Sequence, residues 1–152
     1  MSLAPIRFSV IVPLEPADAF DLFTTRMGRW WPLIDHSIST TSAETCVVEA
    51  VAGGRVYEIS RSGETHLWGE VLIADRPHRV VMTWHPGGGP ATEVEVTFTA
   101  ASKETLVELE HRKWEALGKA AVATRDGYLN GWPYVFVERF AAGADAAARG
   151  EM

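Results

Sequence analysis

The chain contains five histidines, and one of them falls on a face that the sequence predicts to be buried. His111 alternates with Val107 and Leu109, so the three side chains point to the same side of a strand. An imidazole can act as a general base near neutral pH, and ligand cavities usually place a few polar groups among apolar walls. His111 is therefore a candidate polar anchor or general base in a cavity, or else a core histidine that bonds to the backbone. The other four histidines are predicted to lie at the surface: His36, His66, His78 and His85.

The sequence shows no further catalytic or metal-binding signature. There is no His-Glu-x-x-His motif, no cysteine pair and no close pair of histidines on one face, so we expect no metal and no cofactor. Cys46 has no identifiable base partner and is predicted to be a small buried hydrophobic residue. The glycines at 87–89 lack the Lys and Ser/Thr of a phosphate loop, and flanking prolines favour a hairpin tip. These motifs predict no catalytic residue, and they favour a non-enzymatic function without deciding it.

Six tryptophans are many for 152 residues, and they are the strongest indication of a binding function. Each indole buries a large area and carries one N–H group that needs an acceptor. The rings either fill the space between a helix and a sheet, or two or three of them line a cavity for an apolar or aromatic ligand. Trp30 and Trp31 cannot share one face, so we expect one in the core and the other in a wall or rim. The predicted ligand-binding set is Trp30, Trp31, Trp68, Trp84, His111, Trp132 and Phe136.

A helix over residues 125–142 is predicted to cover these candidates. Pro133 lies inside it, removes the hydrogen bond to the carbonyl of Leu129, and predicts a kink. Apolar side chains recur at spacings of three and four, which is typical of one buried helix face. The residues of this stripe are Leu129, Trp132, Phe136 and Phe140.

Alternating apolar and polar residues predict a sheet beneath that helix. A strand at 6–12 precedes a helix that begins near Pro16 and closes at Gly28. Six more strands are joined by short turns, which favour an antiparallel meander. A sheet with one apolar face needs helices on that face, so the fold class is α+β, and so many twisted strands curl the sheet. These six strands are predicted at 45–51, 55–61, 66–74, 79–85, 92–100 and 104–112.

Composition limits the classes of partner. The length predicts a single domain at residues 1–142, followed by a flexible tail at residues 143–152. A net charge of −6 argues against nucleic acid or an anionic membrane surface as partner. We see neither a signal peptide nor an apolar run of about 18 residues, and the single Cys46 fits a reducing compartment, so a cytoplasmic location is expected. Both a monomer and a homodimer are compatible with the sequence.

An ordered set of short motifs resembles one family over residues 6–142. That family contains domains similar to the C-terminal domain of the activator of heat-shock protein 90 ATPase, and it belongs to the START-like (SRPBCC) superfamily. The resemblance implies a helix-grip fold, in which an antiparallel sheet of about seven strands surrounds a long C-terminal helix and a cavity. The motifs are AFDLFT at 19–24, RWWP at 29–32, WGEV at 68–71, PHRVVMTW at 77–84 and Gly131-Trp132.

The resemblance leaves three functions open. The first is a START-like module that binds a small hydrophobic or aromatic ligand between the C-terminal helix and the sheet. The second is a small enzyme of the cyclase or hydrolase type, with His111 as general base. The third is a co-chaperone that stimulates a heat-shock protein 90 ATPase, which makes a chaperone a candidate partner. Since one fold can carry many functions, the residues of the cavity must decide among them.

Overall fold

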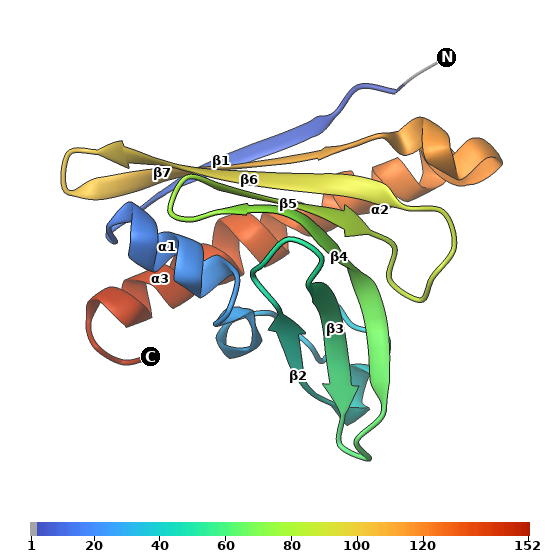
Figure 1. The fold of residues 1–152 in the computed structure, drawn as a ribbon, viewed down its shortest axis with the longest axis horizontal. Coiled ribbons are helices and arrows are strands. Elements are labelled where there is room, and N and C mark those ends of the chain that lie inside the picture. Colours follow the sequence, from blue (N-terminus) through green and yellow to red (C-terminus); the bar gives the residue numbers. More distant parts are fainter. Residues whose placement is uncertain (1–2) are drawn as a thin grey trace.

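The computed structural model describes residues 3–152, which form one curled antiparallel sheet and a long C-terminal helical run. The sheet has seven strands in the order β1-β7-β6-β5-β4-β3-β2, so β1 closes onto the last strand and the others follow chain order. Figure 1 shows the C-terminal run crossing beneath the sheet, with β2 and β3 turned away from the other strands. The strands are β1 (Ile6–Val12), β2 (Ala43–Val48), β3 (Arg55–Ser60), β4 (Thr65–Asp75), β5 (Arg79–Trp84), β6 (Thr92–Ala101) and β7 (Glu104–Arg112).

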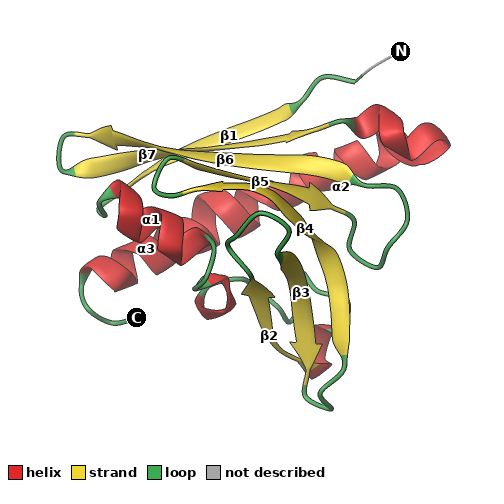
Figure 2. Ribbon diagram, in the orientation of Figure 1, coloured by secondary structure: helices red, strands yellow, loops and turns green. Residues whose placement is uncertain are grey.

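The helices lie on one side of the sheet, and Figure 2 distinguishes them from the strands. The C-terminal run is continuous from residue 121 to residue 148 and includes a central π-helical segment, η4. No helix among the described residues is long and apolar enough to cross a membrane. The helical elements are α1 (Pro16–Phe23), η1 (Met27–Arg29), η2 (Thr40–Ser42), η3 (Trp114–Ala120), α2 (Ala121–Trp132), η4 (Pro133–Phe140) and α3 (Ala141–Ala148).

Two register shifts in β4 curl the sheet. Trp68 is the extra residue against β3, and Leu72 is the extra residue against β5. Bulges of this kind bend a strand and increase its twist. Gly69 sits at the first bend, where a Cβ atom would overlap the carbonyl oxygen of Thr83. Glycine is therefore required at this position.

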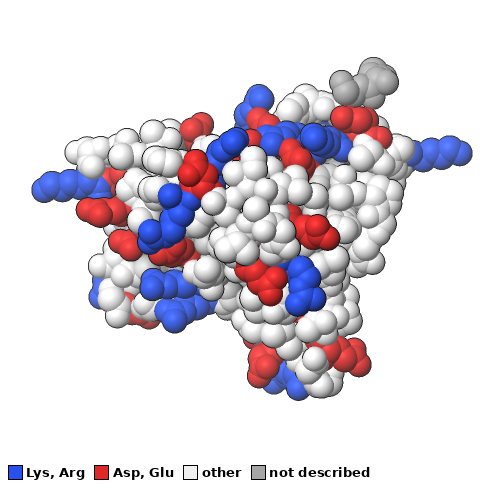
Figure 3. All heavy atoms as spheres, in the orientation of Figure 1, with Lys and Arg blue, Asp and Glu red and all other residues white. Residues whose placement is uncertain are grey.

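The two faces of the sheet differ in chemistry. Alternate residues of β6 and β7 that face the helices are buried, as the period of two predicts. On the opposite face, Arg112 forms ion pairs of 2.6, 2.6 and 2.8 Å with Glu93, Glu95 and Glu110. Figure 3 shows acidic and basic side chains interspersed over the surface. These three carboxylates of the outer face therefore share one guanidinium group.

The C-terminal run differs from its prediction in four respects. It begins at Ala121 rather than at residue 125, and Leu129 is 41% exposed, so this residue is not part of the buried stripe. Pro133 keeps helical dihedral angles (φ −53°, ψ −45°), and the chain widens into η4 where the proline lacks an N–H group. The run also continues past residue 142, because Gly143 and Ala144 are buried and Gly143 packs against Trp30. The helical run thus includes residues 143–148, which the sequence places in the tail.

The core beneath the helices contains an aromatic group that we call the closed cluster. Its rings meet mostly edge to face, with centroids 5.1–6.4 Å apart, and Phe136 stacks on Phe140. Such contacts add to the free energy gained by burying the rings. The closed cluster consists of Phe20, Phe23, Trp30, Phe98, Phe136 and Phe140, all of which are buried.

Candidate ligand-binding site

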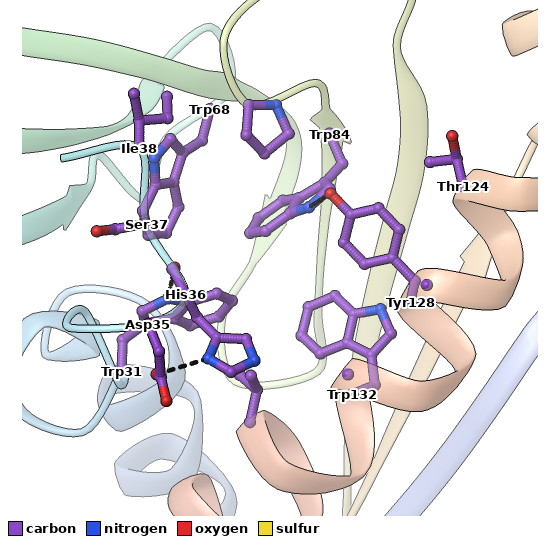
Figure 4. Close-up of a pocket in the computed structure, with 14 residues that line it drawn as sticks. Trp31, Asp35, His36, Ser37, Ile38, Trp68, Trp84, Thr124, Tyr128 and Trp132 are labelled. Atoms are coloured by element: carbon purple, nitrogen blue, oxygen red, sulfur yellow. Dashed lines mark hydrogen bonds and ion pairs between the residues drawn. The ribbon is translucent and has the colours of Figure 1, made fainter. Parts of the chain in front are cut away.

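A cavity of about 490 Å³ opens between α2, the middle of the sheet and the loop at residues 31–38. Four indole rings, which we call the tryptophan box, line this cavity and pack against one another, and Figure 4 shows them close together. Neighbouring rings have centroids 5.1–5.9 Å apart. The volume lies within the range typical of small-molecule sites. The tryptophan box consists of Trp31, Trp68, Trp84 and Trp132.

Two rings of the box are anchored through their N–H groups on the side of the cavity loop. The Nε1–H group of Trp31 donates to the carbonyl oxygen of His36 at 2.7 Å. The Nε1–H group of Trp68 donates to a carboxylate oxygen of Glu58, also at 2.7 Å. These bonds satisfy the polar edge of each ring and leave its carbon atoms to line the cavity.

The other two rings are anchored through α2 and β7. The Nε1–H group of Trp84 donates to the hydroxyl oxygen of Tyr128 at 3.2 Å, and that of Trp132 donates to His111 Nδ1 at 3.0 Å. All four indole N–H groups of the tryptophan box are therefore bonded within the protein. The rings therefore present apolar, π-electron surface to the cavity, which suits a flat aromatic ligand.

His111 is fully buried and does not line the cavity. Its Nδ1 atom accepts from Trp132, so the proton lies on Nε2, which donates to Thr92 Oγ1 at 2.6 Å. The Thr92 hydroxyl in turn donates to the carbonyl oxygen of Trp84 at 3.0 Å. Burial lowers the pKa of His111 to about 3, so the ring stays neutral. With both nitrogens occupied, the histidine is a core residue bonded mainly to side chains, and it has no free lone pair to act as the general base that the sequence suggested.

Two more members of the predicted set lie outside the cavity. Trp30 belongs to the closed cluster and donates its N–H group to the carbonyl oxygen of Leu22 at 2.7 Å. Phe136 is also in the closed cluster, and neither residue lines the cavity. Trp30 and Trp31 thus divide into a core ring and a wall ring, as their adjacency predicted. Of the seven predicted ligand-binding residues, the structure brings the four of the tryptophan box together around the cavity.

Glu58 ties the cavity loop to the sheet. It is fully buried on β3, and its two carboxylate oxygens accept the backbone N–H groups of Ile38 and Ser39 at 2.7 Å each. Burial favours the protonated form, but the hydrogen bonds from Ile38, Ser39 and Trp68 outweigh it and hold the pKa of Glu58 below its usual value. A buried, ionised carboxylate thus positions both a ring of the box and the loop beside it.

Sequence reasoning missed an acid–histidine pair that this loop brings to the cavity. His36 and Asp35 both line the cavity, and His36 Nδ1 lies 2.7 Å from Asp35 Oδ1. The His36 side chain is 32% exposed and its ring packs on that of Tyr134, with centroids 5.4 Å apart. The polar loop that carries the pair has no periodicity, so the sequence held no signal for it.

The α2 side of the cavity is formed by small residues and one tyrosine. Gly127 and Gly131 line the cavity, and a Cβ atom added to either would meet no neighbouring atom. A helical glycine destabilises its helix by about 1 kcal/mol relative to alanine. Since no neighbouring atom excludes a side chain at these two positions, what the glycines provide is open space in the cavity. Tyr128 lies between them and is held by the N–H group of Trp84, and burial raises its pKa, so its hydroxyl keeps its proton.

Metal-ligating side chains do not cluster in the part of the chain that the structure describes. Over residues 3–152, no group of three or more His, Cys, Asp or Glu side chains is arranged to hold a metal ion. Cys46 is buried, as predicted, and burial raises its thiol pKa to about 12. The thiol is therefore protonated and unreactive at neutral pH.

The comparisons with known proteins agree with this architecture. The model of the family described as "Activator of Hsp90 ATPase homolog 1-like protein" matches residues 13–143. No curated protein sequence matches the chain.

Three solved structures illustrate the likeness. One is described as an anthrahydroquino-Gama-pyrone synthase, Txn09, complexed with SUM; it is 31% identical, with a TM-score of 0.64, and the alignment covers 93% of this chain and 97% of that chain. Another is CalC, a self-sacrificing resistance protein from Micromonospora echinospora, which is 28% identical with a TM-score of 0.69 and coverages of 94% and 95%. Protein CV1439 from Chromobacterium violaceum is 16% identical with a TM-score of 0.64 and coverages of 94% and 99%, which shows the shared fold alone.

Proposed function

Because the chain belongs to the family of Activator of Hsp90 ATPase homolog 1-like proteins, whose helix-grip fold it shares, we propose that it binds a flat hydrophobic or aromatic small molecule between α2 and the sheet. The observation that carries the proposal is the tryptophan box. Its rings line an open cavity of about 490 Å³, and the N–H groups of all four rings are bonded within the protein. Burying an apolar ligand there costs no unpaired indole donor, and the ring faces gain stacking contacts.

The nature of the similar proteins supports an aromatic ligand of several fused rings. The name of the 31% identical synthase refers to a polycyclic aromatic compound, and that structure was solved with a bound molecule. In the present chain, the two cavity glycines of α2 leave room along the length of the helix for such a ring system. We therefore propose a polycyclic, phenol-bearing compound as the ligand class.

A fluorescence titration tests the proposal. Addition of 2-hydroxyanthraquinone to the protein should quench tryptophan emission in a saturable way, because four of the six indoles would contact the probe. Gly131→Leu should abolish the saturable phase, since the new side chain projects into the cavity. Asn130→Leu is the matched control: it adds the same side chain at the exposed neighbouring position on α2 and should leave the titration unchanged. Quenching that does not saturate, or that is equal in the two variants, would exclude binding at this site.

Three further expectations stay predictions. Stimulation of a heat-shock protein 90 ATPase rests on the family resemblance, and a pull-down with an ATPase assay on the cognate chaperone decides it. A cytoplasmic location and a monomeric or dimeric state follow from the sequence alone, and cell fractionation and sedimentation test them.

A further inference from the structure

We propose that Asp35 and His36 form a proton-accepting site at the rim of the cavity, which takes the proton from an acidic hydroxyl group of the bound aromatic ligand. The inference rests on the proposed function, because it requires a ligand in the tryptophan box. It goes beyond that function by assigning the cavity a proton transfer and naming the atoms that perform it.

The geometry of the pair fixes the state of the histidine. An ionised aspartate can only accept hydrogen bonds, so at 2.7 Å from Asp35 Oδ1 the Nδ1 atom of His36 carries the proton. The Nε2 atom is then left with a lone pair and can accept a proton, and the carboxylate stabilises the imidazolium that forms. Both residues line the cavity, and Figure 4 shows the His36 ring extending from its loop with the second nitrogen on the side of Trp132.

The pair is held in place by contacts on several sides. The carbonyl oxygen of His36 accepts the N–H group of Trp31, so the backbone at the pair is bonded to a ring of the box. Two residues further on, Glu58 binds the N–H group of Ile38. The ring of Tyr134 packs on the imidazole. A base positioned in this way needs no rearrangement to meet a ligand, which is the condition for efficient proton transfer.

The opposite wall supplies a donor. Tyr128 accepts the N–H group of Trp84, so its own hydroxyl hydrogen is free to bond an oxygen atom of a ligand. Asp35, His36 and Tyr128 are the titratable side chains that line the cavity, and Tyr134 packs on His36. Because the lining residues include no Lys or Arg, the imidazolium is the cation available inside the cavity to stabilise a phenolate.

The step is a simple proton transfer. The O–H bond of the ligand breaks, an N–H bond forms at His36 Nε2, and the electron pair stays on oxygen, which leaves a phenolate beside an imidazolium. Asp35 keeps its hydrogen bond from Nδ1 throughout. A phenolate is a better nucleophile than a phenol, so this step would begin a reaction of the cyclase type, which the family resemblance leaves open.

The experiment measures the ionisation of a bound phenol. The absorbance of 2-hydroxyanthraquinone changes when its hydroxyl group ionises, so a pH titration of the protein-bound probe gives its apparent pKa. We expect this pKa to be about one unit lower on the wild-type protein than on His36→Asn, because a neighbouring cation favours the phenolate. Asp35→Asn should give an intermediate value. The matched control is His66→Asn. The side chain of His66 is 32% exposed, as is that of His36, and its Nε2 atom lies 3.9 Å from Glu64 Oε2, but His66 does not line the cavity.

The outcomes separate the two proposals. Saturable quenching by the probe in His36→Asn shows that the variant is folded and that the cavity is intact. If the probe then ionises at the same pH on the wild type and on His36→Asn, the inference is overturned and the proposed function stands. If the probe does not bind the wild type at all, the proposed function fails and the inference fails with it.

Discussion

Two aromatic regions lie under the C-terminal helical run, and they differ in what their rings do. The closed cluster is mostly phenylalanine, and its buried rings contact one another. The rings of the tryptophan box also pack on one another, yet they line an open cavity. The two regions differ in how many rings are fixed through a polar atom: each ring of the box is anchored by one hydrogen bond at its edge, whereas in the closed cluster Trp30 is the ring with such a bond. A ring fixed by its edge can leave its face uncovered, whereas phenylalanine has no polar atom by which to be fixed.

The largest predicted effect breaks the closed cluster. Phe23 is 1% exposed and contacts four other rings, so Phe23→Ala should lower the free energy of unfolding by about 3–5 kcal/mol through lost contacts and a residual cavity. Trp31→Ala should cost less stability, because its ring already borders open space, while weakening probe binding about tenfold or more. Chemical denaturation and the fluorescence titration measure the two quantities. Equal losses of stability in the two variants would contradict the distinction between the regions.

The second prediction concerns the histidine that supports the box from behind. The folded pKa of His111 is lowered to about 3 from an ordinary value near 6.5, so the unfolded chain takes up the proton first as the pH falls. The stability due to this group is fully present above pH 6.5 and is lost as the pH falls toward 3. Each pKa unit corresponds to about 1.4 kcal/mol, so the loss amounts to a few kcal/mol.

The variant His111→Gln isolates this contribution from that of the carboxylates. Its free energy of unfolding should fall less between pH 7 and pH 4 than that of the wild type. Denaturant midpoints across this pH range check the prediction, and an unchanged slope in His111→Gln would refute it.

The smallest predicted effect sharpens the comparison at the anchor of one ring. The carboxylate of Glu58 accepts three hydrogen bonds on two charged oxygens, whereas the amide of Gln offers one uncharged oxygen. The free energy of unfolding of Glu58→Gln at pH 7 should therefore be lower by about 1–3 kcal/mol. Since the folded pKa of Glu58 is lowered, its stabilisation is present above the usual carboxyl pKa and is lost as the pH falls through the lower value. The variant should therefore be less sensitive to acid than the wild type.

Probe binding in the same variant reports on the site. We expect Glu58→Gln to weaken binding, because the amide holds both Trp68 and the loop at Ile38 and Ser39 less firmly. The exposed Glu64→Gln is the control and should match the wild type in both measurements. Wild-type binding and stability in Glu58→Gln would show that the anchor is dispensable.

Most of the fold could be predicted because its signals are local. The bounds of β1 and β7 agree with the strands expected at 6–12 and 104–112, since alternation and the following turns define both ends. The strand expected at 45–51 instead ends at Val48, because Val51 is exposed in the turn before β3. The candidate site was predicted only in part, since Asp35 and His36 lie in a loop without periodicity. That loop is placed by Glu58, which is twenty residues further along the chain from Ile38.

The sequence by itself determined which side of each element faces inward. The period of two placed His111 with Val107 and Leu109, and the helical spacing placed Trp132 and Phe136 against the sheet. Only the tertiary structure decided what each inward side chain meets. Trp132 borders the cavity, while Phe136, one turn later, is enclosed. Both ring nitrogens of His111 form hydrogen bonds, one with β6 and one with the C-terminal helix. The physical reason is that periodicity encodes the direction of a side chain, whereas contacts and cavities depend on the register, bulges and long-range hydrogen bonds that bring distant elements together.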